Sequence, residues 1–371
     1  MMSAERILPL VEQVFQGLHA KRQRTLATLV AALVTVGRVG VASLGRAIPG
    51  RVAPKHRIKQ VDRFLSNDGI HVDDCCEALT RTVIGPRKSI RIAIDWTAVG
   101  PWNVLVASMV VQRRGQPLYW AACDHLRYTR SQNAIEDAFL TRLHLMIPKD
   151  VEVTLLFDRG FRRVSLVRHL RQLGFHFVIR AMDDIIVVAQ DYKGYLRDLP
   201  LPRAKVRDLG IVQATRDRPT DVRIVAVFDR EQKEAWHLFT DLDLPAADVV
   251  RLYGRRFTIE EVFRDSKSTR YGWSLTEYRL KARLDRLDRL LLVLAAAYFL
   301  VCLIGHHIQA KGLDRLYKAN TVKTRTHSAF QMGWKAYNLV RWLPLVWLGR
   351  FRNLAFDLLD EIVANPAGGQ P

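Results

Sequence analysis

The stretch from residue 89 to residue 181 constrains the fold more than any other part of the chain. Apolar or alternating segments predict strands, with a turn at Arg113–Gln116 between the second and the third. The expected elements are strands at 89–97 and twice within 102–123, a helix at 133–147, a strand at 151–161, a helix at 162–174 and a strand at 175–181. Three strands followed by helix, strand, helix and strand indicate an α/β fold.

The segments on either side of this stretch have a different texture and suggest further divisions. Short apolar runs between turn residues predict a β-rich insertion, whereas the beginning and end of the chain read as helices. The expected parts are a helical region at 1–88, the first part of an α/β core at 89–181, a β-rich insertion at 182–245, the second part of the core at 246–305 and a helical basic region at 306–371.

The strong positive charge narrows the class of partner. The 371 residues carry a formal net charge of +20, which favours a polyanion, and nucleic acid first. The alternative is a ribosome-associated or merely basic soluble protein. Four cysteines are too few and too scattered for a disulfide framework or a zinc site, and acids stand where a signal peptide would carry positive charge. We therefore expect a cytoplasmic protein, and we expect the 15-residue apolar run at 290–304 to be a buried helix rather than a membrane span.

Two helices near the start of the chain are candidates for DNA binding. A helix ending near Gly37, a short break and a second short helix suggest a helix-turn-helix. A basic amphipathic segment follows at 54–67, with apolar residues on one face. Its cations are available for phosphate: Lys55, Arg57, Lys59 and Arg63. An ordinary helical subdomain with basic solubilising residues explains the same pattern.

The C-terminal region offers a second possible nucleic-acid surface. Between Gly305 and Asn353 there are nine Lys and Arg residues against one acid, Asp314. Four aromatic residues lie among them: Trp334, Tyr337, Trp342 and Trp347. Aromatic side chains at helical spacing are more often core residues, so core packing is the favoured interpretation here.

One short segment carries a stripe of chemically active side chains. In YGRRFTIEEVFRDSK, residues 253–267, Tyr253, Arg256, Glu260 and Lys267 are separated by three, four and seven positions. At 3.6 residues per turn these positions fall on one face of a helix. Such a face is either a solvated helix surface or a site that handles phosphate and metal.

Carboxylates follow two of the predicted strands. Asp95 follows the apolar run IRIAI and Asp158 follows VTLLF, the position at which α/β sheets place ligand-handling residues. Each alone is explained by a turn or a cap. With Glu260 they form a set of hard oxygen donors suited to Mg²⁺, and two ions can share three acids while bridging a phosphate. Glu261 lies about 100° round the helix from Glu260 and is the second choice.

These residues resemble a known family. The blocks IDWT, FDRGF and YGRRFTIEEVFRDSK look like the three acidic blocks of bacterial DDE transposases, and the third fits the Y-x2-R-x3-E-x6-K signature of the insertion sequence four family without a gap. The resemblance implies an RNase H-like mixed-sheet core interrupted by a β-rich insertion, with helical ends. It also implies two Mg²⁺ ions, with Mn²⁺ as a substitute, and cut-and-paste transposition between terminal inverted repeats by a synaptic homodimer.

Carried over to this sequence, the resemblance assigns the catalytic and metal-binding triad to Asp95, Asp158 and Glu260. End nicking by water would release a 3′-OH, which would attack the opposite strand or target DNA. The alternatives are a catalytically inactive descendant that only binds DNA, and a metal-dependent nuclease without strand transfer.

The resemblance also implies contacts to double-stranded DNA. Tyr253, Arg256 and Lys267 would contact phosphates near the transposon end, a role that suits a phenol and two cations. Trp236, in AWHLFT, would stack on a flipped base; without the resemblance, a core position would be the simpler interpretation. Phe257 departs from the family, in which some members have tryptophan after the signature arginine.

Overall fold

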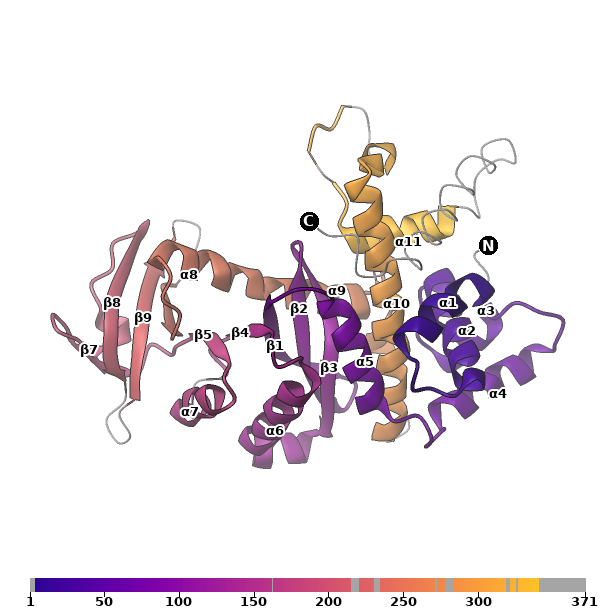
Figure 1. Ribbon diagram of the computed structural model, residues 1–371, viewed down its shortest axis with the longest axis horizontal. Coiled ribbons are helices and arrows are strands. Elements are labelled where there is room, and N and C mark those ends of the chain that lie inside the picture. The colour runs from indigo at the N-terminus through magenta and orange to yellow at the C-terminus, as the bar shows by residue number, and fades with distance from the viewer. Residues whose placement is uncertain are drawn as a thin grey trace.

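The computed structural model contains one continuous sheet with helices on both faces (Figure 1). The structure describes residues 4–161, 163–214, 220–229, 234–270, 272–277, 283–317, 321–324 and 326–339. The strands are β1 (Ser89–Val99), β2 (Trp102–Val111), β3 (Arg114–Asp124), β4 (Glu152–Phe157), β5 (His176–Arg180), β6 (Ile186–Val188), β7 (Lys193–Tyr195), β8 (Lys205–Ala214), β9 (Thr220–Phe228) and β10 (Trp236–Thr240).

The sheet has ten strands in the order β3-β2-β1-β4-β5-β10-β9-β8-β6-β7. Strand β4 runs parallel to both of its neighbours, β1 and β5. All other neighbouring strands are antiparallel. The segment from β6 to β10 therefore extends the same sheet, because β10 pairs with β5. The predicted α/β class, a mixed-sheet core with helical regions at both ends, is confirmed.

The helices occupy the two ends of the chain and both faces of the sheet. They are α1 (Ala4–Val14), α2 (Ala20–Val36), α3 (Val41–Ala47), α4 (Pro54–Leu65), α5 (Val72–Ile84), α6 (His125–Met146), α7 (Val164–Gln172), α8 (Ala246–Tyr253), α9 (Thr258–Lys267), α10 (Leu284–Ala310) and α11 (Ala329–Leu339). Short 3-10 helices are η1 (Leu196–Asp198), η2 (Gly254–Phe257), η3 (Leu275–Glu277) and η4 (Leu313–Tyr317). In Figure 1, α8 and α9 lie on one side of the sheet, and α6 and α7 lie on the other.

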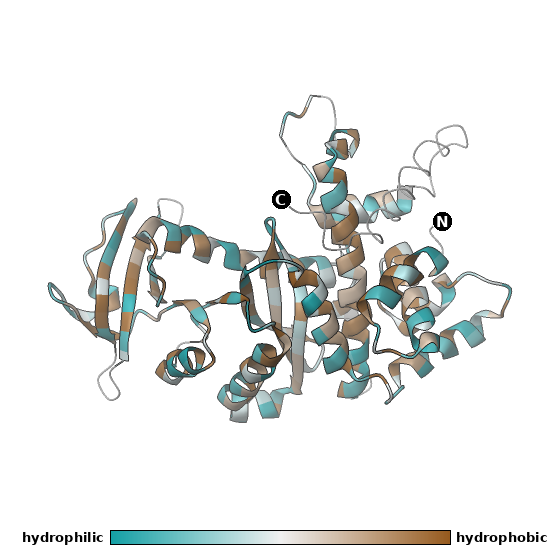
Figure 2. Cartoon of the chain, in the orientation of Figure 1, coloured by the Kyte–Doolittle hydropathy of each residue, from teal (hydrophilic) through white to brown (hydrophobic). Residues whose placement is uncertain are grey.

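Helix α10 joins the α/β core to the helical N-terminal part. It packs against β3, α2, α4, α5 and α11, and it is apolar along most of its length (Figure 2). By length and composition it could cross a membrane, yet 83% of its most apolar 18-residue window is buried inside the protein. It is therefore the central core helix, as expected for the run at 290–304.

The packing of α10 on α11 is close enough to exclude side chains. A Cβ atom on Gly305 would lie 1.9 Å from the carbonyl oxygen of Ala329, and one on Gly333 would lie 1.8 Å from that of Val301. Of the C-terminal aromatics, Tyr337 is buried and Trp334 donates its indole N–H to the carbonyl of Val34. These two are core residues. Trp342 and Trp347 lie outside the described residues, as does the rest of the predicted C-terminal region beyond 339.

The N-terminal helices have the expected order. Helix α2 ends at Gly37, whose φ of +66° favours glycine, and α3 leaves at 96° to it. Helix α4 follows and buries Val61, Phe64 and Leu65 against the core.

Several boundaries differ from the sequence prediction, and β4, for example, ends at Phe157 rather than at Phe161. The turn between β2 and β3 lies at Gln112 and Arg113, both with positive φ, rather than at Arg113–Gln116. Gly115 instead lies inside β3, where a Cβ atom would come within 2.7 Å of Val262 on α9. Glycine at this position allows α9 to pack closely on the sheet, and it is not part of the turn. Helix α6 begins at His125, where Asp124 accepts the backbone N–H of Arg127 at 2.7 Å, and it is kinked at Ser131. The part after the kink corresponds to the helix predicted at 133–147.

The segment with the charged stripe is also divided. The helical spacing of the stripe predicts one helix through 253–267, but the chain forms α8, then the 3-10 turn η2, then α9. Tyr253 is 1% exposed and Arg256 is 6% exposed, so the stripe begins buried, whereas Glu260 on α9 is exposed. Burial of a guanidinium requires partners, and these lie on β1.

Candidate active site

The first candidate carboxylate lies where the parallel pairing of the sheet ends. Ile94 of β1 pairs with Phe157 of β4, and this is the last parallel pair between the two strands. Asp95 and Asp158 come next, so they lie side by side. Asp95 is not at the end of its own strand, because β1 continues to Val99 along β2.

Asp158 begins a tight turn after β4. Its Oδ1 accepts the backbone N–H of Gly160 at 2.8 Å, and its carbonyl accepts that of Phe161 at 3.3 Å. The backbone of the turn thus fixes the carboxylate beside Asp95. A second oxygen, Oδ2, has no hydrogen-bond partner within the part of the chain that the structure describes.

Arg256 links the two remaining elements of the site. Its guanidinium donates to Asp95 Oδ2 at 3.2 Å and to Glu260 Oε1 at 2.7 Å. Burial works against its charge, but Tyr253, Asp95 and Glu260 together raise the pKa of Arg256. Arg256 therefore remains a cation, and two of the three acids share its single positive charge.

The charge balance is visible at Asp95. Burial, and next the negative charge of Asp158, raise the pKa of Asp95 to about 6, while Arg256 opposes the shift. Three carboxylates on converging elements repel one another, and a divalent cation relieves such repulsion. Oxygen donors of this kind suit Mg²⁺.

The donor set fits a divalent ion by its chemistry, with Arg256 as the competing cation. Within the described ranges, no group of three or more acidic, histidine or cysteine side chains is arranged as a ready-made metal centre. Arg256 binds Oδ2 of Asp95 and Oε1 of Glu260, which leaves the second oxygen of each carboxylate available to a cation. The second oxygen of Asp95 also accepts the backbone N–H of Trp96 at 2.8 Å.

Lys267 approaches the same strand from the end of α9. Its ammonium donates to Thr97 Oγ1 at 2.6 Å, and burial lowers its pKa although Asp95 acts in the opposite direction. Asp95 and Thr97 are two residues apart on β1 and hence face the same side of the sheet, toward α9. The helix thus brings Glu260 and Lys267 over the strand that carries Asp95.

An aromatic cluster borders the site on the β10 side. Trp236 contacts Tyr253 edge to face at 5.0 Å between ring centroids and lies 5.7 Å from the ring of Phe257. Phe257 is 39% exposed, and the guanidinium of Arg256 lies 4.7 Å from its centroid. Trp236 is itself half-buried, so the cluster has both a packed side and an open side.

Glu261 points away from the other acids. It pairs with Arg114 of β3, which also pairs with the buried Asp265. Tyr298 of α10 donates to Asp265 at 3.0 Å. This buried network fixes α9 to the sheet, and Glu261 belongs to it rather than to the candidate site.

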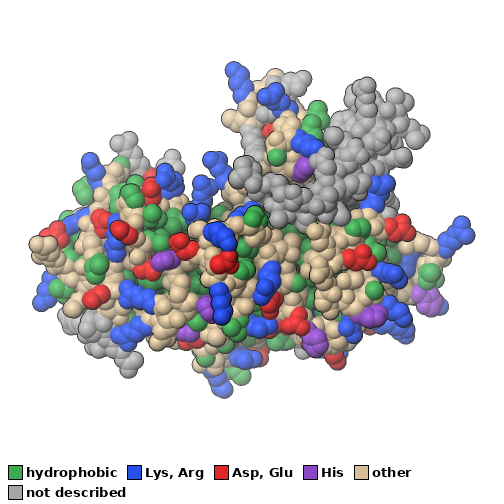
Figure 3. All heavy atoms as spheres, viewed as in Figure 1, with side chains coloured by type: hydrophobic (Ala, Val, Ile, Leu, Met, Phe, Trp, Pro, Cys, Tyr) green, Lys and Arg blue, Asp and Glu red, His purple; other side chains and the backbone are tan. Residues whose placement is uncertain are grey.

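The basic residues of α4 do not share one environment. Lys55, Lys59 and Arg63 are exposed, whereas Arg57 donates to the backbone carbonyl of Ile48. Over the visible face of the molecule, Lys and Arg side chains are spread among acidic ones instead of forming one patch (Figure 3).

Two arginines beside Asp158 were not singled out from the sequence. Arg159 and Arg180 both donate to Glu234 Oε2, at 3.0 and 2.9 Å. Arg159 is part of the block FDRGF, but spacing does not reveal a partner 75 residues later. Both guanidiniums lie at the edge of the sheet where β4 and β5 end.

The sequence matches one known domain family. A family model described as Transposase DDE domain matches residues 105–300, more than half of the chain. The matched range contains Asp158 and Glu260 and begins ten residues after Asp95. No curated protein matches the sequence. On the length of the family match, the chain belongs to the transposase DDE domain family.

Proposed function

We propose that the chain is a cut-and-paste DNA transposase of the insertion sequence four type, with Asp95, Asp158 and Glu260 as its catalytic acids. Membership of the transposase DDE domain family supports the transposase activity. The observation that carries the residue assignment is the placement of Asp95 and Asp158 next to each other on parallel strands, with Glu260 joined to Asp95 through Arg256.

The proposed cofactor is two Mg²⁺ ions, or Mn²⁺ in their place. Bound divalent ions would activate the attacking oxygen and stabilise the leaving oxygen of an in-line displacement at phosphorus. Asp95, Asp158 and Glu260 would hold them. The turn at Gly160 orients Asp158, and the buried Arg114–Asp265 pair holds α9 and therefore Glu260 at a fixed height above β1.

The remaining residues of the stripe would bind the transposon end. Lys267 and Arg256 offer charge-assisted hydrogen bonds to phosphate, and the Tyr253 hydroxyl offers a neutral one. When a phosphate approaches, it can replace the carboxylates as the partner of Arg256. This exchange would release Asp95 and Glu260 for the cation.

The aromatic cluster would receive a base taken out of the duplex. Trp236 would supply the stacking surface, with Phe257 as the exposed neighbour in place of the family's tryptophan. Stacking on an aromatic ring returns about 1–3 kcal/mol per base, which offsets most of the cost of flipping.

The other parts of the chain would support catalysis by these three acids. Helices within 1–88, including Lys55, Lys59 and Arg63 of α4, would bind DNA outside the cut site, and Arg57 would support their position. The core would comprise 89–181 and 246–305, with 182–245 as the insertion and 306–371 as the C-terminal region. The active species would be a cytoplasmic, nucleoid-associated homodimer that holds two inverted repeats and then target DNA.

Cleavage of DNA that carries the inverted repeats flanking the reading frame tests this function. Wild-type protein with Mg²⁺ should nick at the repeat end and then join the 3′-OH to a target plasmid. Binding without cleavage would indicate an inactive descendant, and cleavage without joined products would indicate a nuclease. Either result would contradict the proposed function.

A further inference from the structure

A cavity of about 480 Å³ lies on the face of the sheet opposite α9, between α6 and the turn after β4. Its walls include Tyr128, Gln132 and Asn133 of α6, with Arg159 and Met182 facing them. The cavity is large enough for one nucleotide. None of these residues belongs to the stripe on α8 and α9.

The cavity adjoins the candidate acids. Gly160, which also lines it, is the residue whose N–H holds the Asp158 carboxylate. On the other side, the ring of Tyr128 contacts that of Trp96 edge to face at 4.9 Å, and Trp96 follows Asp95 on β1. Side chains alternate along a strand, so Asp95 faces α9 while Trp96 faces α6. A strand that passes over Asp95 and Asp158 would leave the α9 face and reach this cavity.

A hydrogen-bond network supports the wall formed by α6. Glu136 is 2% exposed and accepts the Trp96 indole N–H at 3.0 Å and the Gln132 amide at 2.9 Å. Arg163 completes the network, since it donates to Glu136 and to the carbonyl of Asn133. The helix also departs from helical geometry at Ser131, between Tyr128 and the two amides. Arg163 pairs with the buried Glu136 and also with the partly exposed Asp137, so two acids on that side share one guanidinium.

Several polar groups of the wall are left for a ligand. The Tyr128 hydroxyl and the Asn133 side-chain amide have no hydrogen-bond partner among the residues that the structure describes. The Gln132 amide uses only its N–H group, which leaves its carbonyl oxygen. Arg159 is exposed, and its partner Glu234 is exposed too, so it can exchange that partner for phosphate. An aromatic ring, amide groups and an arginine are the groups that bind a base and its phosphate.

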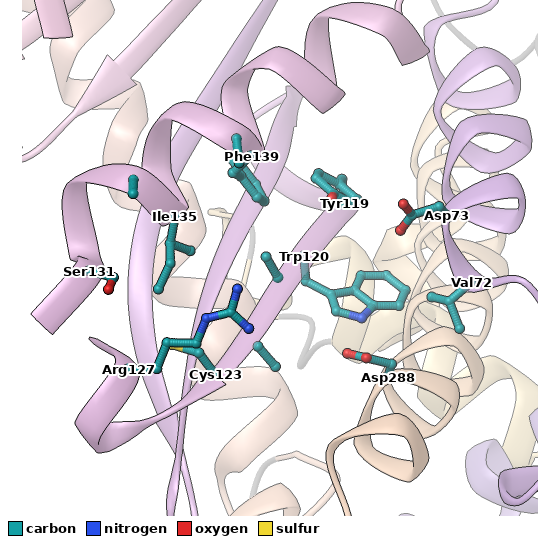
Figure 4. A pocket seen from close by; sticks show the side chains of 14 residues that line it. Val72, Asp73, Tyr119, Trp120, Cys123, Arg127, Ser131, Ile135, Phe139 and Asp288 are labelled. Atoms are coloured by element: carbon teal, nitrogen blue, oxygen red, sulfur yellow. The ribbon is translucent and has the colours of Figure 1, made fainter. Parts of the chain in front are cut away.

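A second cavity of similar size has carboxylates where a nucleotide site needs positive or neutral groups. This cavity, about 500 Å³, lies between α5, α6, β3 and α10 (Figure 4). Asp73 and Asp288 lie on either side of the Trp120 indole at one end of it (Figure 4). These carboxylates would repel a phosphate, and the cavity lies on the side of α6 away from Asp158. It therefore provides a matched negative comparison.

We propose that the cavity beside Asp158 binds a nucleotide of the flanking donor DNA, the nucleotide that follows the scissile phosphate on the side away from α9. Tyr128 stacks on its base, Asn133 and Gln132 bind the base edge, and Arg159 binds its phosphate. This inference rests on the proposed function, because it places one strand across Asp95 and Asp158. Tyr128 and Asn133 are thereby assigned to binding of the flanking nucleotide.

The test uses end DNA with 2-aminopurine at successive flanking positions, bound to the full-length protein without metal so that no cleavage is required. One flanking position should lose fluorescence on binding, and Tyr128→Ala should restore it. Tyr128→Phe should preserve the quenching. Arg127→Ala is the matched control, because Arg127 is an exposed cation on the same helix that lines the other cavity.

A second measurement guards against loss of folding at Tyr128. Asn133→Ala changes an exposed side chain and should lower cleavage about 5- to 50-fold with Mg²⁺ while leaving binding of pre-cleaved ends unchanged. Quenching that persists in Tyr128→Ala, or that appears equally on pre-cleaved ends without a flank, would overturn the assignment. If wild-type protein binds and quenches but never cleaves, the proposed function fails and the binding site stands.

Discussion

The guanidinium of Arg256 lies 3.2 Å from Asp95 Oδ2, in a part of the protein where both side chains are largely buried. The same group bonds Glu260. An arginine expected from the sequence to face DNA phosphate therefore begins as the counter-ion of the proposed catalytic acids. Arg256 can pair with a carboxylate or with a DNA phosphate. We therefore expect both a bound cation and bound DNA to change which partner it has.

Removal of this counter-ion should make the site depend on a divalent cation. Arg256→Gln leaves Asp95 buried without its partner, which should cost roughly 3–5 kcal/mol of stability in the absence of metal. Mg²⁺ should then raise the melting temperature of the variant more than that of the wild type. Arg255→Gln is the control, since the neighbouring arginine makes no ion pair in the described structure. An equal Mg²⁺ response in both variants would argue against a shared cation site.

DNA binding should depend strongly on salt, because many phosphates would be neutralised by Lys and Arg. With roughly 6–10 phosphate contacts, affinity for end DNA should fall about 10³- to 10⁵-fold between 50 and 200 mM salt. Lys59→Ala, at an exposed position, should reduce the logarithmic slope by about one contact. Arg57→Ala should lower stability instead, because Arg57 is bonded to Ile48. A flat salt titration would point to a partner other than nucleic acid.

Asp288 should make stability depend on pH. Burial, and next the charge of Asp73, raise its pKa to about 6 from an ordinary 3.8. The folded protein then binds more protons than the unfolded chain between these values, so wild-type stability falls as pH rises through about 4 to 6. Asp288→Asn should remove this loss and be more stable than wild type above pH 7, by up to about 3 kcal/mol.

Denaturant unfolding at pH 4.5 and pH 7.5 measures the effect. The advantage of Asp288→Asn should be small at the lower pH and full at the higher one. Asp184→Asn, at an exposed position, serves as the control and should show no such change. If the stability advantage of Asp288→Asn were the same at pH 4.5 and pH 7.5, the pKa of Asp288 would not be raised in the folded protein.

Substitution of Trp236 distinguishes a base-stacking role from a role in core packing. It contacts Tyr253 and Phe257 but is only half-buried, so Trp236→Ala should cost less than the roughly 3–5 kcal/mol of a fully buried aromatic. We expect a modest fall in melting temperature and a slower step after first nicking, partly restored by an abasic nucleotide at the flipped position. A large loss of stability with normal activity in the folded fraction would assign Trp236 to the core.

The order of elements in the core could be predicted because its strands are continuous apolar runs. Asp95 and Asp158 were recognisable because each carboxylate directly follows such a run, and Glu260 because helical spacing groups it with Arg256 and Lys267. Local periodicity determines these features.

The contacts between distant elements could not be predicted in the same way. Spacing on a helix does not show that Arg256 reaches β1, or that Arg114 pairs with Asp265, 151 residues later. Gly115 was taken for a turn residue because the reason for its missing side chain, the approach of α9, is tertiary. The cavity beside α6 likewise depends on where Arg159 and Met182 meet that helix.

Asp95, Asp158 and Glu260 are proposed to act as one catalytic site. The most direct test of this proposal is Mg²⁺-dependent cleavage of end DNA by Asp158→Ala, measured beside binding of the same DNA, with Asp95→Ala and Glu260→Ala as companions. Each substitution removes one of the three proposed metal ligands, so cleavage should fall below detection while binding remains close to that of the wild type. Cleavage by Asp158→Ala at near the wild-type rate would contradict the account.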